Sequence, residues 1–178
     1  MGHGYQKFKK NHNFAKVSLR IIMAKKTFPE EATLEEREEI FLFLEDRFGL
    51  KRDLFEDYLI LRGASTFWLF PKTDHLIQLK KLTPEVVGLL FLRRVSGYLK
   101  PTSTFLQRFG QYATKNVILL EAEQLKTLQE RQRLEIALDI QPGYVIVRDE
   151  DWILGCALYL PGRLYSYFEK KVIKNLLD

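Results

Sequence analysis

The sequence predicts an α+β protein in two modules that meet near Gly110, and three observations support this class. The 178 residues suit one domain or two small ones, and a hydrophobic fraction of 46% is ordinary for a protein that buries a core. A complete set of strand-like and helix-like segments lies on each side of Gly110-Gln111. The stretch Gln141–Tyr159 has the composition of a β-hairpin.

The first module opens with a helix signature. Thr33 is followed by Glu36, and this spacing predicts a capping box, in which each side chain bonds the other residue's backbone. An apolar face over Ile40–Phe48 predicts a helix that Gly49 ends. The later elements that we predict are a short helix from Asp53, strands Tyr58–Leu61, Thr66–Phe70 and His75–Leu79, a helix from Thr83-Pro84 to about Arg94, a strand Val95–Leu99 and a helix Pro101–Phe109.

The second module is organised around the hairpin Gln141–Tyr159. Tyr144–Val147 is a β-branched and aromatic run, Arg148–Asp151 is a polar tip, and Trp152–Leu160 resumes the strand. Gly155 lies inside this second strand, where glycine marks a bulge or a close backbone approach. The other predicted elements are strand Asn116–Leu120, helix Glu121–Gln129, strand Leu134–Leu138, a turn at Pro161-Gly162, strand Leu164–Phe168 and a closing helix Glu169–Leu177.

The net charge of +5 is unevenly placed. Residues 1–29 hold seven basic side chains and no acid, which leaves 21 basic and 23 acidic residues for the rest of the chain. We expect residues 1–32 to form a flexible basic arm, which can bind phosphate backbones without sequence preference. The alternatives are a solvated terminus without a ligand and a natural start at Met23.

Several function classes are disfavoured by what the sequence lacks. No apolar run approaches the ~20 residues of a membrane span, and there is no secretory signal. Cys156 is the single cysteine, so no internal disulfide forms, and its apolar strand predicts a buried, unreactive thiol. No cofactor loop, nucleophile motif or zinc spacing is present. We therefore expect a cytoplasmic protein that is not an enzyme and needs no cofactor or metal.

The sequence also resembles a known family. The pattern PGYVIV, a polar tip and ILG in Gln141–Tyr159 resembles the central hairpin of PUA domains, and the order of elements from Lys115 onward is similar to theirs. Upstream, RFGLKRDLFEDYLILRGASTFWLFPK (Arg47–Lys72) resembles the opening of pre-PUA modules. SGYLKPTSTFLQRFG (Ser96–Gly110) is similar to the C-terminal part of 5-methylcytosine rRNA methyltransferases.

This resemblance implies a mixed α/β pre-PUA-like module over residues 33–110. A PUA-like RNA-binding domain, a β pseudobarrel with a C-terminal helix, would then occupy 111–178. The methyltransferase catalytic half is absent, and the same two-module layout occurs in small ribosome-biogenesis factors. The resemblance also implies RNA contacts from the segment that holds Arg131 and Arg133, between the domain's first helix and the next strand.

The candidate binding residues are cations near aromatic side chains, because cations neutralise phosphates and tyrosines stack on unpaired bases. The main set is predicted to lie on one side of the second module: Arg163, Lys170, Lys171 and Lys174, with Tyr165 and Tyr167. A second set lies near the joint: Lys100, Arg108 and Lys115. The alternative for both sets is a solvated lysine face above core tyrosines.

Two function classes remain. The first is a non-catalytic RNA-binding accessory factor for rRNA or tRNA modification or for ribosome biogenesis. Its partners would be structured RNA and a ribosome-assembly factor or RNA-modifying enzyme, with no membrane. The second is a protein-interaction scaffold that docks a partner through the acidic helix Thr33–Phe48. The slight negative charge of the chain beyond the arm favours this second class.

Overall fold

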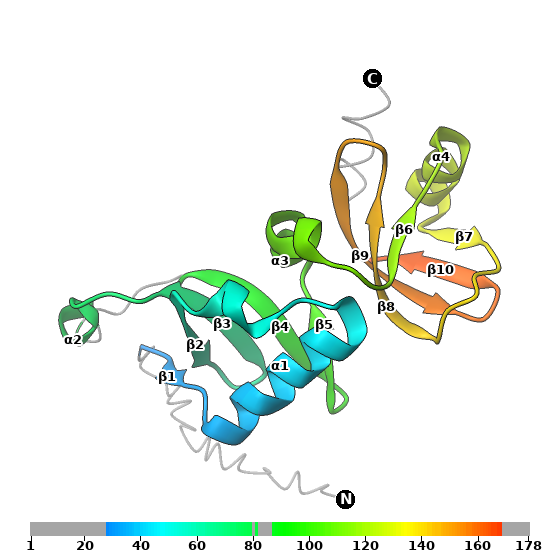
Figure 1. Ribbon diagram of the computed structural model, residues 1–178. Coiled ribbons are helices and arrows are strands. Elements are labelled where there is room, and N and C mark those ends of the chain that lie inside the picture. The colour runs from blue at the N-terminus through cyan, green and yellow to red at the C-terminus, as the bar shows by residue number, and fades with distance from the viewer. Residues whose placement is uncertain (1–27, 80, 82–86, 169–178) are drawn as a thin grey trace, which may run out of the picture.

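Two sheets organise the protein in the computed structural model, which describes residues 28–79, 81 and 87–168 (Figure 1). The first sheet is an antiparallel meander of β1 (Glu30–Glu31), β2 (Tyr58–Arg62), β3 (Thr66–Pro71), β4 (Leu89–Val95) and β5 (Tyr98–Pro101). The second contains β6 (Val117–Leu119), β7 (Arg133–Glu135), β8 (Gly143–Arg148), β9 (Ile153–Leu160) and β10 (Arg163–Ser166). Its order is β6-β8-β9-β10-β7, with β6 parallel to β8, and it curls into a half-barrel. The α+β class is confirmed.

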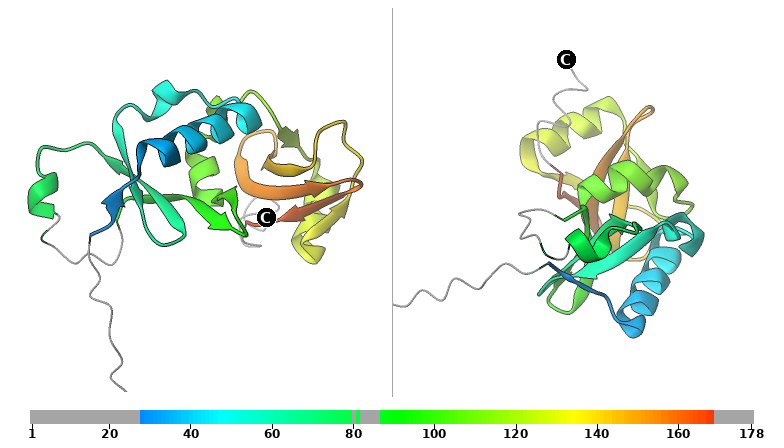
Figure 2. Two further views of the ribbon diagram at one scale, coloured as in Figure 1. Left: turned by 90° about the horizontal axis from the view of Figure 1, so that it is seen from below. Right: turned by 90° about the vertical axis from the view of Figure 1, so that its left-hand side faces the viewer.

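The helices lie around these sheets. They are α1 (Leu34–Phe48), α2 (Leu76–Leu79), α3 (Ser103–Phe109) and α4 (Ala122–Arg131), with single 3-10 turns at Arg52–Phe55 and Gly110–Tyr112. Figure 2 shows α1 lying along the first sheet and α4 at the end of the second sheet that is remote from the first. The predicted closing helix Glu169–Leu177 and residues 1–27 of the predicted arm lie outside the described residues. Within the described part of that arm, Glu30–Glu31 pairs with β2.

Helix α1 has the predicted ends. The Thr33 and Glu36 side chains each accept a hydrogen bond from the other residue's backbone N–H, at 3.2 and 2.9 Å. Gly49 ends the helix in the left-handed conformation, with φ of 66°. The buried side chains of the helix are Ile40, Phe41, Leu44 and Phe48. The apolar face therefore packs on the first sheet, as its spacing predicts.

The predicted helix from Thr83-Pro84 to Arg94 is wrong over Leu89–Arg94, which belong to β4. Thr83 and Pro84 themselves lie outside the described residues. Leucine favours helices, but here both edges of the segment are taken by neighbouring strands, and tertiary pairing overrides the local preference. Gly88 precedes the strand with φ of 68°.

Two further elements near this strand differ from prediction. His75–Leu79 is predicted as a strand but contains the helix α2, whose side chain Ile77 is exposed. The predicted strand Val95–Leu99 is in fact a hairpin turn, because Ser96 and Gly97 both have positive φ, at 50° and 86°. Positive φ at both central residues is the requirement of a type I′ turn, which joins β4 tightly to β5.

The second sheet follows its predicted hairpin closely. Opposite Val147 and Arg148 the pairing of β9 shifts by one residue next to Gly155, so the predicted bulge is present. The close approach is present too, because a Cβ atom on Gly155 would lie 2.5 Å from the Ser103 Cβ. The predicted strand Leu134–Leu138 is shorter, since β7 ends at Glu135 and the Leu138 backbone instead bonds the Tyr159 hydroxyl.

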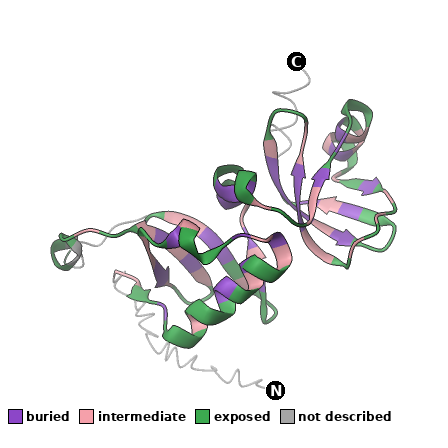
Figure 3. Ribbon diagram, in the orientation of Figure 1, coloured by how far each residue is buried: buried purple, intermediate pink, exposed green. Residues whose placement is uncertain are grey.

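A shared core joins the two sheets at α3. Phe105, Leu106 and Phe109 of this helix are buried in one cluster with residues of the first sheet, and Ile146 and Cys156 of the second sheet belong to the same cluster. Figure 3 shows buried segments on α3 and on strands of both sheets. A second cluster lies between the inner face of the half-barrel and α4. The joint at Gly110 is therefore packed on both sides.

Candidate functional site

The outer face of the second sheet carries a row of aligned side chains. The strand register places Arg133 opposite Tyr165, Tyr165 opposite Leu158, and Leu158 opposite Tyr144. Arg133 is exposed and the other three are half-buried. Residues of opposite parity, such as Leu164 and Val145, fill the inner core. The outer face therefore shows one guanidinium and two phenol rings in line across the strands.

A second guanidinium lies next to this row. Arg163 is two residues from Tyr165 on β10, and its Nε lies 3.4 Å from one carboxylate oxygen of Glu135. The other oxygen of Glu135 lies 3.3 Å from the Arg133 Nε. The hydrogen bond with Tyr165, together with the charge of Glu135, raises the pKa of Arg163. All three charged side chains are more than half exposed, so the cluster is solvated and carries a net positive charge.

Lys100 and Tyr167 come together where the two sheets meet. The Lys100 Nζ lies 3.2 Å from the centre of the Tyr167 ring, and the Tyr144 ring centre lies 6.2 Å from that of Tyr167. Burial lowers the pKa of Lys100, and the charge of Arg93 acts in the same direction. Burial likewise raises the pKa of Tyr144. The predicted aromatic Tyr167 thus holds a cation here, and Lys100 is drawn out of bulk water.

A groove of about 590 Å³ opens beside this pair, between β3, β4 and β5 on one side and α3 with Tyr167 and Phe168, which follow β10, on the other. Arg93 is the cross-strand partner of Lys100, and both side chains line the groove with Trp68. Two hydrogen bonds join α3 to β9 beneath the groove. The Ser103 hydroxyl accepts from the Cys156 N–H, and the Gln107 amide donates to the Leu154 carbonyl at 2.8 Å.

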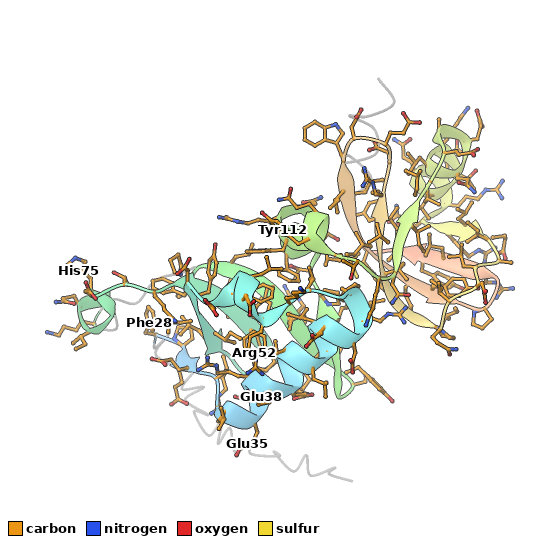
Figure 4. All side chains as sticks on the ribbon, viewed as in Figure 1. Phe28, Glu35, Glu38, Arg52, His75 and Tyr112 are labelled. Atoms are coloured by element: carbon orange, nitrogen blue, oxygen red, sulfur yellow. The ribbon has the colours of Figure 1, made fainter. Side chains whose placement is uncertain are left out.

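Other predicted site residues are spread over the molecule. The Arg108 guanidinium lies 5.9 Å from the Phe109 ring centre, the Lys115 ammonium donates to the Glu45 carbonyl at 3.4 Å, and Arg131 is exposed in the last turn of α4. Tyr112, an exposed residue of the joint that is not among the predicted site residues, is labelled in Figure 4. The predicted residues that lie outside the described part are Lys170, Lys171 and Lys174.

Arg93, Trp68 and Tyr144 are site residues that are not among those predicted from the sequence. The helix predicted over Leu89–Arg94 gives Lys100 no cross-strand partner and so does not indicate Arg93. The Ser96-Gly97 dipeptide could have revealed it, since a two-residue hairpin there puts Arg93 opposite Lys100. Tyr144 belongs to a run that predicts a buried strand, but its register places it on the outer face.

The acidic helix α1 uses several of its charges within the chain. Glu39 makes two hydrogen bonds to Arg94, at 2.8 and 2.6 Å, and this contact lowers the pKa of Glu39. Glu36 pairs with Arg62 at 3.2 Å, and Glu38 contacts Arg52, as Figure 4 shows. These pairs leave fewer free carboxylates on the helix for a partner than the sequence predicts.

No model of a known protein family matches the chain, and no curated protein matches it either. In the part of the chain that the structure describes, no helix has the length and apolar character that a membrane crossing requires. Within the same residues, no three His, Cys, Asp or Glu side chains gather as a metal site would need. The function proposed below therefore depends on the geometry of the surface.

Proposed function

We propose that this chain is an RNA-binding accessory protein with a pre-PUA-like first module and a PUA-like pseudobarrel as its second. It acts in rRNA or tRNA modification or in ribosome biogenesis and contributes binding without catalysis. The observation that carries the proposal is the row Arg133, Tyr165, Leu158 and Tyr144 with Arg163 beside it. Guanidinium groups fit phosphate oxygens, while phenol rings offer stacking surfaces for unpaired bases.

The half-barrel supports this reading because its two faces have different compositions. The inner face contributes buried apolar side chains such as Val145 and Leu164 to the second cluster, whereas Arg133, Tyr165 and Tyr144 lie with Leu158 on the outer face. Sheets that bind single-stranded RNA use the same combination of cations and exposed rings. Lys100 and Tyr167 extend the surface toward the first module.

The test is an electrophoretic shift with total cellular RNA over a range of salt concentrations. Replacing Arg133 and Arg163 by glutamine should weaken binding and flatten the logarithmic salt slope by about 1.5 units, because each lost phosphate contact removes roughly 0.7 to 0.9. Lys51→Gln with Lys126→Gln is the matched control, since both lysines are exposed on other elements. Unchanged binding by the arginine variant and by the control would overturn the proposal.

Glu135 provides a test of opposite sign. Its carboxylate lies near both guanidinium groups and competes with phosphate for them. Glu135→Gln should therefore tighten RNA binding, whereas a surface that binds an uncharged or basic partner would be unaffected or weakened. The separate reversal of Lys170, Lys171 and Lys174 to glutamate should flatten the salt slope by about three units at most.

A second candidate, a protein-interaction scaffold acting through α1, is favoured by two exposed leucines. Leu34 and Leu42 are 70% and 62% exposed on this helix. The intrachain pairs of Glu36 and Glu39 weaken the electrostatic part of that reading. If Leu42→Glu abolishes co-purification of a partner while RNA binding by the purified chain is absent, this second function replaces the first.

A further inference from the structure

Resting on the proposed function, we propose that the groove between the sheets is a nucleotide site for single-stranded RNA. In it, Arg93 and Lys100 bind one phosphate, and Trp68 stacks on the adjacent base. The groove is distinct from the row on the outer face of the second sheet, and it is built mainly by the first module. The RNA would thus contact both modules.

The charge arrangement in the groove points to an anion. Arg93 and Lys100 are direct cross-strand partners, and like charges at such positions destabilise a strand pair. Among the described residues, no carboxylate lines the groove. The neighbouring Arg94, on the opposite face of β4, forms an ion pair with Glu39. An arginine of this strand can therefore have a carboxylate partner within the chain, whereas no carboxylate of the described residues faces Arg93 and Lys100 in the groove. A phosphate would neutralise the two remaining cations.

Lys100 is held ready for such a contact. Its ammonium lies on the Tyr167 ring, which fixes the side chain but satisfies none of its three N–H donors as well as an oxygen would. Partial burial strengthens an electrostatic contact at this point, because the surrounding medium screens it less than bulk water. Arg93 beside it is exposed and able to approach a phosphate from solvent.

Trp68 supplies a stacking surface next to the cations. It lies on β3 and is half-buried, and its indole N–H donates to the Thr66 hydroxyl at 3.1 Å, so the polar edge of the ring is satisfied within the chain. The ring lines the groove together with Leu89 and Leu90. Stacking tolerates any base, because every base has a π face.

The size and the rim select an unpaired nucleotide. A volume of about 590 Å³ lies in the range of small-molecule pockets, which suits one extruded nucleotide and excludes a base pair held within a duplex. Thr104 and Gln107 add hydroxyl and amide groups to the lining. Such groups can bond the edge of a base that is splayed out of a helix.

The two tryptophans of the chain allow a direct test. Trp152 lies at the exposed tip of the β8–β9 hairpin, so Trp152→Phe leaves Trp68 as the only indole. In this background we expect hexauridylate to quench the Trp68 fluorescence with saturation, while a blunt duplex RNA does not. Adding Arg93→Gln and Lys100→Gln should weaken hexauridylate binding about tenfold or more. The variant Lys51→Gln with Lys126→Gln should behave like the parent.

Further arms of the experiment separate the sources of phosphate. If uridine monophosphate quenches Trp68 and hexauridylate does not, the groove takes a free nucleotide and the single-stranded RNA site is wrong. If inorganic phosphate alone displaces hexauridylate, the phosphate contact is supported. Equal quenching by the blunt duplex would also overturn the proposal. Unchanged near-ultraviolet circular dichroism shows that the cation variants remain folded.

Failure of this site is distinguishable from failure of the proposed function. If total RNA binds and Arg133→Gln with Arg163→Gln weakens it, the RNA-binding function stands. If, in that case, hexauridylate does not quench Trp68 and the Arg93→Gln, Lys100→Gln variant binds RNA normally, only the proposed nucleotide site is wrong. If no RNA binds to any form of the chain, both proposals fail.

Discussion

At Gly155 the backbone of β9 passes so close to α3 that any side chain would meet it. A Cβ atom there would lie 2.5 Å from the Ser103 Cβ and 3.1 Å from the Phe168 Cβ. The residue also has φ of 140°, a conformation that side chains disfavour. Gly155 therefore combines a steric and a conformational requirement at the point where the two modules touch.

Gly155→Ala should lower the free energy of unfolding by about 3 kcal/mol, because strain and overpacking add. Gly97→Ala is the matched control, since Gly97 also has positive φ, at 86°, but nothing lies within 4 Å of its added Cβ. The control should lose only the conformational part, about 1 kcal/mol. Urea unfolding of both variants measures the difference, and equal losses would show that the contact with α3 has no effect.

The Cys156 thiol gives the protein a dependence on alkaline pH. Burial raises the pKa of this thiol to about 12, from 9.0 when it is solvated. Above pH 9 the unfolded chain loses this proton while the folded chain retains it, so stability falls as pH rises toward 12. Below pH 9 the thiol is protonated in both states and has no effect.

Between pH 9 and 12 this thiol should lower the stability of the parent by up to about 1.4 kcal/mol per pH unit, and Cys156→Ala should abolish that decrease. The measurement is urea unfolding of the parent and the variant at several pH values, which cancels the titration of the other groups. The two curves should differ by a constant below pH 9. Parallel curves at alkaline pH as well would mean that the thiol is solvated. The same burial predicts slow labelling of the folded protein by a thiol reagent at pH 8.

The elements that sequence reasoning recovered are those with strong local signals. The capping box of Thr33, the bulge at Gly155 and the turn at Pro161-Gly162 each need particular residue types at fixed positions, and each is present. Strand β4 carries no such signal, because Leu89–Val95 is rich in leucine and its identity as a strand depends on partners distant in the chain. A local sequence pattern does not predict pairing between segments distant in the chain.

The same reason limited the prediction of the candidate site. Lys100, Arg163, Tyr165 and Tyr167 could be selected from the sequence as cations and aromatics close together in the chain. The groove could not be predicted, since Arg93 and Trp68 reach it from strands whose register the sequence left open. Because Leu89–Arg94 is predicted as a helix, the sequence does not place Arg93 beside Lys100 in the groove.

The turn between β4 and β5 is a place where the chain can be stabilised. Ser96 has φ of 50° and directly precedes Gly97. At the position of Ser96, the first central residue, type I′ turns prefer asparagine. Ser96→Asn should raise the free energy of unfolding by about 0.5 kcal/mol. Ser96→Val should lower it by about 1 kcal/mol or more, because a β-branched residue resists positive φ. Thermal unfolding of the pair gives the comparison, and a stabilising valine would contradict the turn type.

On the scale of the whole molecule, the two sheets form one packed unit. Besides the shared cluster at α3, the Arg47 side chain of α1 donates to the Tyr144 carbonyl at 2.6 Å and to the Gln141 carbonyl at 3.1 Å. Burial of this guanidinium lowers its pKa. The Thr114 N–H in turn donates to the Phe48 carbonyl at 2.9 Å. Hydrogen bonds and core both cross the joint.

The chain should accordingly unfold in a single transition, with equal calorimetric and van't Hoff enthalpies. Arg47→Met should lower the stability of the whole chain by about 2 kcal/mol, because it leaves two carbonyls at the joint without their charged donor. Two resolved transitions in the parent would show that the modules are independent. Arg37→Met on the same helix is the control, since Arg37 is exposed away from the joint.

The shared core also has a consequence for synthesis on the ribosome. Phe105 and Phe109 leave the ribosome well before Cys156, their neighbour in the buried cluster. At roughly 5–20 residues per second, the intervening stretch takes on the order of 2 to 9 s to translate. For that time Phe55 of the first module can already pack on both rings, but the side of α3 that contacts Ile146 and Cys156 stays uncovered. Chains released before β9 is complete should therefore aggregate readily and depend on chaperones.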